Sequence, residues 1–327
     1  MFLLLPFFSL LPFVSSISDP PRVSTLYGPV RGYTYTADAG FEAEIFKRIP
    51  YAKPPLGDGR WHKPVAPDKW AIELDATVMG PACASSSKEQ HPLSGYSEDC
   101  LHINVYTSEA CRKSPSGCAV VVYAHGGALL IDSPVLFEDE PLVNSFVRND
   151  VVLVTVGYRL GVFGTLALGD ENALPANLGL HDFIAALRFT REIIAEFGGD
   201  VDRITLMGHS SGGEMALEAA LSPAVSPPGV KPLFSSVISM SGLLVLQSEE
   251  EQIMKTRKFA LAAGCSGSAA EIIPCLHTKT TEEILTAQGA TGGAAPMGDE
   301  QLGRIVMTGE LFPIRRQLEV LENPVVS

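Results

Sequence analysis

The sequence predicts an α/β fold with a mostly parallel central sheet and helices on both of its faces. Between about residues 119 and 240, strand patterns and helix patterns alternate with short links, which is the signature of such a sheet. The strands are expected at 119–124, 151–156, 203–207 and 236–240, and the helices at 180–197 and 213–221. The first two strands are continuous β-branched runs, which indicates burial on both faces. The first helix has apolar side chains at helical spacing and ends at Gly198-Gly199.

The flanking regions predict less regular structure. Residues 22–36 are expected to form short strands around the turn pair Gly28-Pro29. The proline-rich run at 50–67 predicts loop, because proline lacks an amide donor and biases the preceding residue away from helix. Residues 248–285 are charged and helical in pattern, and 323–327 are expected to begin a further strand.

Length and charge limit the possible functions. The 327 residues can bury one large core or two smaller ones. A net charge of −13 disfavours nucleic acid and anionic membrane surfaces as partners. The apolar block within residues 1–18 is too short and too rich in proline to span a bilayer, and small residues follow it. We therefore predict a signal peptide at 1–18 and a secreted or ER-lumenal protein, with an uncleaved anchor as the alternative.

The six cysteines form three pairs that are local in sequence: Cys83/Cys100, Cys111/Cys118 and Cys265/Cys275. An even number of cysteines fits an oxidising compartment, so local disulfides are expected. None of the spacings is Cys-x-x-Cys, so neither a zinc site nor any other metal is predicted.

Ser210 is the strongest candidate for chemistry. It lies in Gly208-His209-Ser210-Ser211-Gly212, between an expected strand and an expected helix. A serine exposed on such a sharp turn needs very small neighbours two positions away on either side, which this pattern supplies. The alternative is a glycine-serine turn without chemistry.

A second candidate, His125-Gly126-Gly127-Ala128, directly follows the first buried strand. The tetrahedral intermediate of ester hydrolysis carries an oxyanion, which needs backbone N–H donors fixed in place beforehand. Glycines let a loop turn its amides toward such a site, and the amide after the nucleophile, that of Ser211, is a further donor. The alternative is a tight loop at the end of a strand.

Taken together, these motifs resemble the type-B carboxylesterases, the α/β-hydrolase family that includes the cholinesterases. The matching stretches, listed in family order, are residues 49–57, 97–106, 125–128, 158–164, 177–182, 197–200 and 208–213. The resemblance covers the chain from about residue 22 onward. It implies an α/β-hydrolase domain over 19–327 and a serine esterase that needs no cofactor.

Residue by residue, the resemblance implies Ser210 as nucleophile and Gly127, Ala128 and Ser211 as oxyanion donors. Ala128 stands where many members have a third glycine, a change expected to be mild because either residue offers its amide. The family's first two disulfides match Cys83–Cys100 and Cys265–Cys275, whereas Cys111 and Cys118 have no counterpart and their pairing is left open. The family's buried ion pairs match Arg60 with Glu98 and Arg159 with Asp182.

Two departures from the family narrow the substrate. Cholinesterases hold a quaternary ammonium on a tryptophan inside the first cysteine-closed loop, and residues 83–100 contain none. The family's common glutamate before the nucleophile is His209 here, which removes a negative charge. A small neutral carboxylic ester is therefore the expected substrate, with acyl preference and oligomeric state left open.

The triad partners of Ser210 are not found in the sequence. The family order is serine, acid, histidine, and the acid follows a strand after a segment matched by Leu311-Phe312-Pro313. His277 is the only histidine after Ser210, and a surface role is expected for it. His209 is not expected to be the catalytic base, because adjacent residues on such a turn point apart. We expect a domain incomplete at its C-terminus, with a bare sheet edge and very weak or no hydrolysis. The alternatives are a non-catalytic adhesion protein and a truncated product without independent function.

Overall fold

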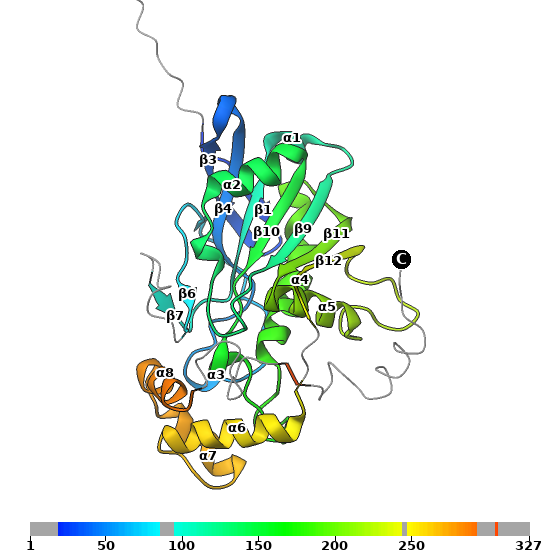
Figure 1. Cartoon of the computed structure of the whole chain (residues 1–327). Helices are drawn as coiled ribbons and strands as arrows, with labels where there is room; N and C mark the ends of the chain where they lie inside the picture. Colours follow the sequence, from blue (N-terminus) through cyan, green and yellow to red (C-terminus); the bar gives the residue numbers. More distant parts are fainter. Residues whose placement is uncertain (1–18, 86–94, 244–246, 293–304, 307–327) are drawn as a thin grey trace, which may run out of the picture.

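The computed structural model describes residues 19–85, 95–243, 247–292 and 305–306 (Figure 1). The expected signal peptide at 1–18, the segment Leu311-Phe312-Pro313 and the expected strand at 323–327 lie outside the described residues.

A seven-stranded sheet forms the centre of the fold, in the order β12-β11-β9-β10-β8-β4-β3. Its strands are β3 (Tyr33–Thr36), β4 (Glu42–Pro50), β8 (His102–Thr107), β9 (Cys118–Ala124), β10 (Val151–Val156), β11 (Gly199–His209) and β12 (Ser236–Met240). The four strands predicted from the sequence, β9 to β12, are parallel to one another. The other three pair antiparallel, so the sheet is mixed and the α/β-hydrolase prediction holds with an added antiparallel half.

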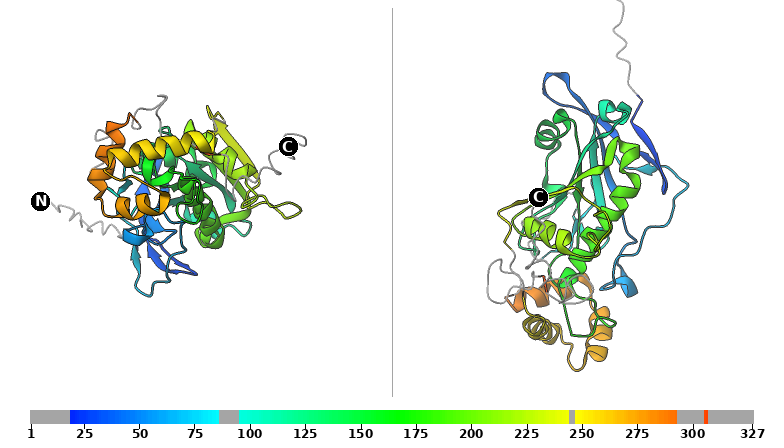
Figure 2. Two further views of the ribbon diagram at one scale, coloured as in Figure 1. Left: turned by 90° about the horizontal axis from the view of Figure 1, so that it is seen from below. Right: turned by 90° about the vertical axis from the view of Figure 1, so that its right-hand side faces the viewer.

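Helices lie on both faces of the sheet, as predicted (Figures 1 and 2). On one face α4 (Leu178–Ile193) and α5 (Ser211–Leu221) pack onto β9, β10 and β11, where they bury the largest apolar cluster. On the other face α2 (Asp139–Ser145) and the turn after it contribute Val143 and Val147 to a cluster with Tyr106 and Leu153 of the sheet. Hydrophobic burial on both faces therefore fixes the strand ends that carry the candidate site.

Smaller elements surround the sheet. They are β1 (Arg22–Thr25), β2 (Gly28–Arg31), β5 (Leu74–Asp75), β6 (Ala82–Cys83), β7 (Tyr96–Ser97), α1 (Glu109–Lys113), α3 (Gly161–Gly164), α6 (Glu249–Ala262), α7 (Ala269–His277) and α8 (Thr281–Ala290). The helices α6 to α8 lie together at one end of the molecule (Figure 1), in the region predicted to be helical. They bury a separate cluster around Trp61 and Phe163. None of the helices among the described residues is long and apolar enough to cross a membrane.

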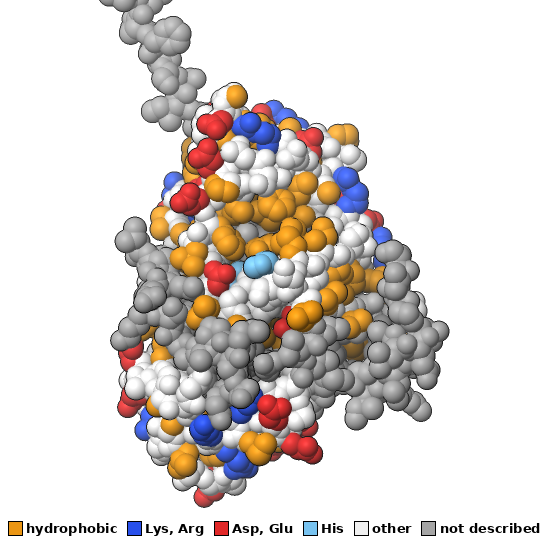
Figure 3. All heavy atoms as spheres, viewed as in Figure 1, with side chains coloured by type: hydrophobic (Ala, Val, Ile, Leu, Met, Phe, Trp, Pro, Cys, Tyr) orange, Lys and Arg blue, Asp and Glu red, His pale blue; other side chains and the backbone are white. Residues whose placement is uncertain are grey.

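The strand β12 is the outermost strand of the sheet beyond β11. Its residue Ile238 is 45% exposed, and Tyr123 of β9 and Met207 of β11 are only partly buried. Figure 3 shows hydrophobic side chains gathered on the face of the molecule seen in that view. Among the described residues β12 is an edge strand, and it carries no charged residue or proline that would discourage pairing.

Candidate active site

Ser210 lies at the sharp turn between β11 and α5. Its backbone has φ 56° and ψ −126°, a strained conformation for a residue with a side chain. The turn is held from both sides, because the Ser210 amide donates to the Met240 carbonyl at 2.7 Å and the Glu214 amide donates to the Ser210 carbonyl at 3.0 Å. The side chain of Ser210 is therefore placed by two backbone hydrogen bonds at the C-terminal ends of parallel strands.

The glycines around Ser210 are required by close packing. A Cβ on Gly208 would lie 2.1 Å from the Gly212 carbonyl oxygen, and one on Gly212 would lie 2.2 Å from the Ala124 carbonyl oxygen. Real Cβ atoms do not approach backbone so closely, so these positions admit glycine alone without a backbone shift. The sequence pattern thus has the steric cause that was expected of it.

Residues 125–132, here called the Gly-Gly loop, lie against this turn. The strands β9 and β11 are parallel neighbours, and Ala124 pairs with Gly208, so the loop and the turn leave the sheet side by side. A Cβ on Gly126 would lie 3.3 Å from Ser210 Cβ. The loop predicted to offer oxyanion donors is therefore in contact with the predicted nucleophile.

The Gly-Gly loop has an unusual number of left-handed residues. Gly127 has φ 92°, and Ala128, Leu129 and Asp132 have φ 58°, 56° and 77°. Each left-handed residue with a Cβ costs roughly 1–2 kcal/mol. Ala128 was expected to replace glycine mildly, and its left-handed backbone means that the replacement carries a strain that glycine avoids.

A neighbouring segment, residues 157–161, holds the carbonyls of the Gly-Gly loop. Tyr158 stacks on His125 with ring centroids 4.3 Å apart, and its hydroxyl donates to the His125 carbonyl at 2.5 Å. The Gly161 amide donates to the Leu129 carbonyl at 2.7 Å. Two carbonyls of the loop are thereby fixed from outside it.

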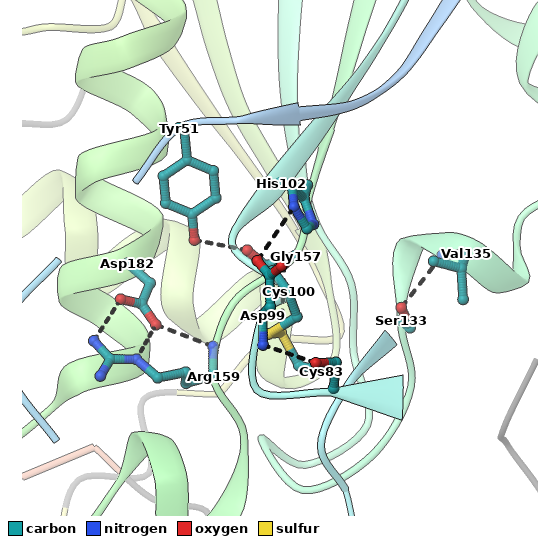
Figure 4. Close-up of a disulfide and its surroundings, with 11 residues drawn as sticks. Tyr51, Cys83, Asp99, Cys100, His102, Ser133, Val135, Gly157, Arg159 and Asp182 are labelled. Carbon is teal, nitrogen blue, oxygen red and sulfur yellow. Dashed lines mark hydrogen bonds and ion pairs between the residues drawn. A yellow bond between two sulfur atoms is a disulfide. The ribbon is translucent and has the colours of Figure 1, made fainter. Parts of the chain in front are cut away.

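The buried ion pair of Arg159 and Asp182 anchors that segment (Figure 4). Asp182 is fully buried and accepts from the Arg159 amide at 3.1 Å and from its guanidinium at 2.7 Å through two nitrogens. Burial raises the pKa of Asp182, and the arginine opposes this shift. Tyr51 adds a hydrogen bond of 2.7 Å to the Gly157 carbonyl. The second expected pair joins Arg60 and Glu98, with an N–O distance of 2.5 Å.

No hydrogen bond joins a histidine to Ser210 among the described residues. His209 is exposed. His125 is buried, and desolvation lowers its pKa against the opposing effect of the Asp132 carboxylate. His277 lies on α7, where its Nδ1 is 3.1 Å from the Gly57 carbonyl and its ring meets Trp61 edge-on. The surface role expected for His277 thus agrees with its position.

All three cysteine pairs are disulfides in the structure, including the pair left open. Cys111–Cys118 closes a short loop, with a Cα separation of 5.4 Å. Cys83–Cys100 and Cys265–Cys275 pair as the resemblance implied. Only Cys111, Cys118 and Asp150 come together with metal-ligand geometry in the described ranges, and the disulfide occupies both sulfurs. No metal centre is therefore indicated in that part of the chain.

Sequence reasoning missed two groups that support the site and one buried carboxyl further along α5. It did not single out Tyr158 or the hydroxyl of Ser211, which accepts a hydrogen bond from the Leu129 amide at 3.2 Å. It also missed Glu218, a fully buried carboxyl in α5. Tyr158 stands in the matched stretch 158–164, which could have drawn attention to it; the other two carry no signal in their local sequence.

Comparison with known proteins agrees with this geometry. The chain is 36% identical over 318 residues to human carboxylesterase 3, covering 93% of the chain and 52% of that relative. Rabbit liver carboxylesterase 1 is 34% identical, with 82% and 48% covered. The solved structure of PNB esterase matches with a TM-score of 0.77 and 33% identity, covering 93% of this chain and 61% of that one.

The chain spans about half the length of the curated relatives it matches. The sequence model described as the Carboxylesterase family matches residues 19–324. With the elbow at Ser210 and the Gly-Gly loop beside it, this match over most of the sequence shows that the chain belongs to the carboxylesterase family.

Proposed function

We propose that Ser210 is the nucleophile of a carboxylic ester hydrolase. The observation that carries the proposal is the contact between the strained turn at Ser210 and the Gly-Gly loop. In this reaction the Ser210 oxygen attacks the ester carbonyl, the alcohol leaves, and water then hydrolyses the acyl-enzyme. Membership of the carboxylesterase family supports ester chemistry in particular.

The oxyanion would be bound by the amides of Gly127, Ala128 and Ser211. Ser211 is the first residue of α5, so its amide is among the N–H groups that have no carbonyl partner within the helix. The partial positive charge of the helix N-terminus adds to the stabilisation of an anion there. Donors that are fixed before the reaction stabilise an oxyanion more than donors that must reorganise. The hydrogen bonds that hold the Gly-Gly loop in place therefore favour this role.

The substrate we propose is a small neutral ester. Asp132 is the last residue of the Gly-Gly loop, and a Cβ on Gly127 would be 2.8 Å from its Cβ. Its carboxylate disfavours an anionic acyl group near the oxyanion donors. A quaternary ammonium is disfavoured by the lack of tryptophan within residues 83–100. We further propose a secreted or ER-lumenal location, which the three disulfides support.

A single-turnover acylation assay tests the substrate proposal. Excess protein is mixed with p-nitrophenyl acetate, the p-nitrophenyl monoester of succinate, or acetylthiocholine, and the leaving group is followed. We expect Ser210-dependent release to be fastest with p-nitrophenyl acetate relative to each reagent's rate in buffer. With substrate in excess we expect slow release, because no hydrogen bond joins a histidine to Ser210 among the described residues and a serine without such a base reacts on the order of 10⁴-fold more slowly. Release that is equal in Ser210→Ala would refute the nucleophile.

A further inference from the structure

We propose that the hydroxyl of Ser211 is a positioning group that ties the Gly-Gly loop to the nucleophile turn, an inference that rests on the function proposed above. The Ser211 hydroxyl oxygen accepts a buried hydrogen bond from the Leu129 amide at 3.2 Å. The two residues are 82 positions apart in the sequence, and only the pairing of β9 with β11 brings their segments together. The bond is therefore a tertiary contact between the two halves of the site.

The tie acts where the loop needs support. Ala128 and Leu129 are both left-handed, with φ 58° and 56°, although neither is glycine. A strained backbone persists only where its surroundings hold it in place. The Gly161 amide already fixes the Leu129 carbonyl at 2.7 Å, so the bond to Ser211 fixes the other end of the same residue.

The Leu129 amide belongs to the peptide plane that begins at Ala128. When Ser211 accepts a hydrogen bond from this N–H, the orientation of the peptide plane between Ala128 and Leu129 is fixed. The backbone torsions of Ala128, which lie between this plane and the Ala128 amide, are then restricted as well. The Ala128 and Gly127 amides are proposed donors to the oxyanion, and donor placement within a fraction of an ångström governs their value. Ser211 would thus contribute twice, its own amide binding the oxyanion and its hydroxyl orienting the loop.

The ordinary alternative is a small residue chosen to fit the first turn of a helix, since serine is frequent at helix starts. In that case the hydroxyl of Ser211 would have no role of its own. Ser211 is 7% exposed, so the loss of its oxygen would leave the buried Leu129 amide without its acceptor. The two explanations therefore differ in what Ser211→Ala does to Leu129.

Amide hydrogen exchange at Leu129, read at single-residue resolution, tests the tie directly. We expect exchange to be faster in Ser211→Ala by on the order of 10-fold, the typical effect of losing a buried hydrogen bond. The adjacent substitution Ser210→Ala is the matched control and should leave Leu129 exchange unchanged. Ser211→Thr, which keeps a hydroxyl, should retain the slow exchange. Equal exchange in the wild type and Ser211→Ala overturns the tie.

Labelling kinetics with a fluorophosphonate test whether the tie serves the reaction. Ser211→Ala should lower the maximal rate of labelling at Ser210 by on the order of 10-fold, less than the loss of an oxyanion donor itself. The concentration giving half-maximal rate should change by less than about twofold, because ground-state binding is not altered. Faster exchange with an unchanged labelling rate would make the tie merely structural and overturn the positioning role. A wild-type chain that takes no label refutes the proposed function itself, whereas Leu129 exchange still decides the tie.

Discussion

Glu218 lies in α5, two turns beyond the nucleophile, and its carboxyl group has no hydrogen-bond partner among the described residues. The residue is 1% exposed, and within the part of the chain that the structure describes both carboxyl oxygens are buried without a hydrogen bond. Burial, with a smaller effect from the charge of Glu214, raises the pKa of Glu218 well above its usual 4.5. The carboxyl is therefore protonated in the folded protein under conditions in which the unfolded chain ionises it.

The sign of the pH dependence follows from this difference. A raised pKa stabilises the fold fully below the unfolded value, near pH 4.5, and the contribution is lost as the pH rises toward the folded pKa. Each pH unit in that window removes about 1.4 kcal/mol. Glu218→Gln has no proton to lose and should remove this dependence. Its advantage over the wild type should be near zero at pH 4.5 and should grow by about 1.4 kcal/mol for each pH unit within that window.

Urea unfolding between pH 4.5 and pH 8, followed by the fluorescence of buried Trp61, provides the assay. Glu214→Gln is the matched substitution one turn earlier on the same helix. Because Glu218 is protonated in this window and carries no charge for Glu214 to repel, Glu214→Gln should leave the pH dependence in place. A difference between Glu218→Gln and the wild type that does not vary with pH would refute the reasoning.

Three further predictions concern stability and association. Asp182→Asn should lower the free energy of unfolding in urea by about 3–5 kcal/mol, because it leaves a buried arginine unpaired. The control Glu109→Gln breaks an exposed ion pair and should lower it by less than about 1 kcal/mol. Similar losses in the two variants would contradict this prediction. Replacing both cysteines by serine should cost about 3 kcal/mol at Cys83–Cys100 and about 2 kcal/mol at Cys111–Cys118, since the loops span separations of 17 and 7 residues; the reverse order would exclude loop entropy as the cause. Ile238→Lys should reduce self-association through β12 in light scattering, and unchanged association would place the contact elsewhere.

The parallel half of the sheet could be predicted because its strands carry their signal locally. The runs at 119–124 and 151–156 are β-branched and apolar, as strands buried on both faces must be. The antiparallel strand β4 was missed because it contains Glu44 and Lys47, which look like surface residues. In the fold both are nearly buried, since Arg112 neutralises Glu44 and Asp139 neutralises Lys47. The partners in each pair are far apart in the sequence, and no local pattern indicates that they pair.

The candidate site divides in the same way. The turn at Ser210 and the Gly-Gly loop could be predicted, because steric demands restrict the residues that fit there. The hydroxyl of Ser211 and the protonated Glu218 could not, because a serine after the nucleophile and a glutamate in a helix are ordinary in sequence. Their environments come from strands and loops that lie elsewhere in the chain. The tertiary packing around Ser211 and Glu218, which the local sequence does not indicate, gives these two residues their unusual environments.

The central claim is that Ser210 is a nucleophile held against an oxyanion site. Its most direct measurement is the mapping of a fluorophosphonate adduct by peptide mass spectrometry on the wild type, with Ser210→Ala beside it. We expect one adduct, on Ser210 and not on the neighbouring Ser211, and no labelling of Ser210→Ala. An adduct on another residue, or equal labelling of Ser210→Ala, would contradict the assignment.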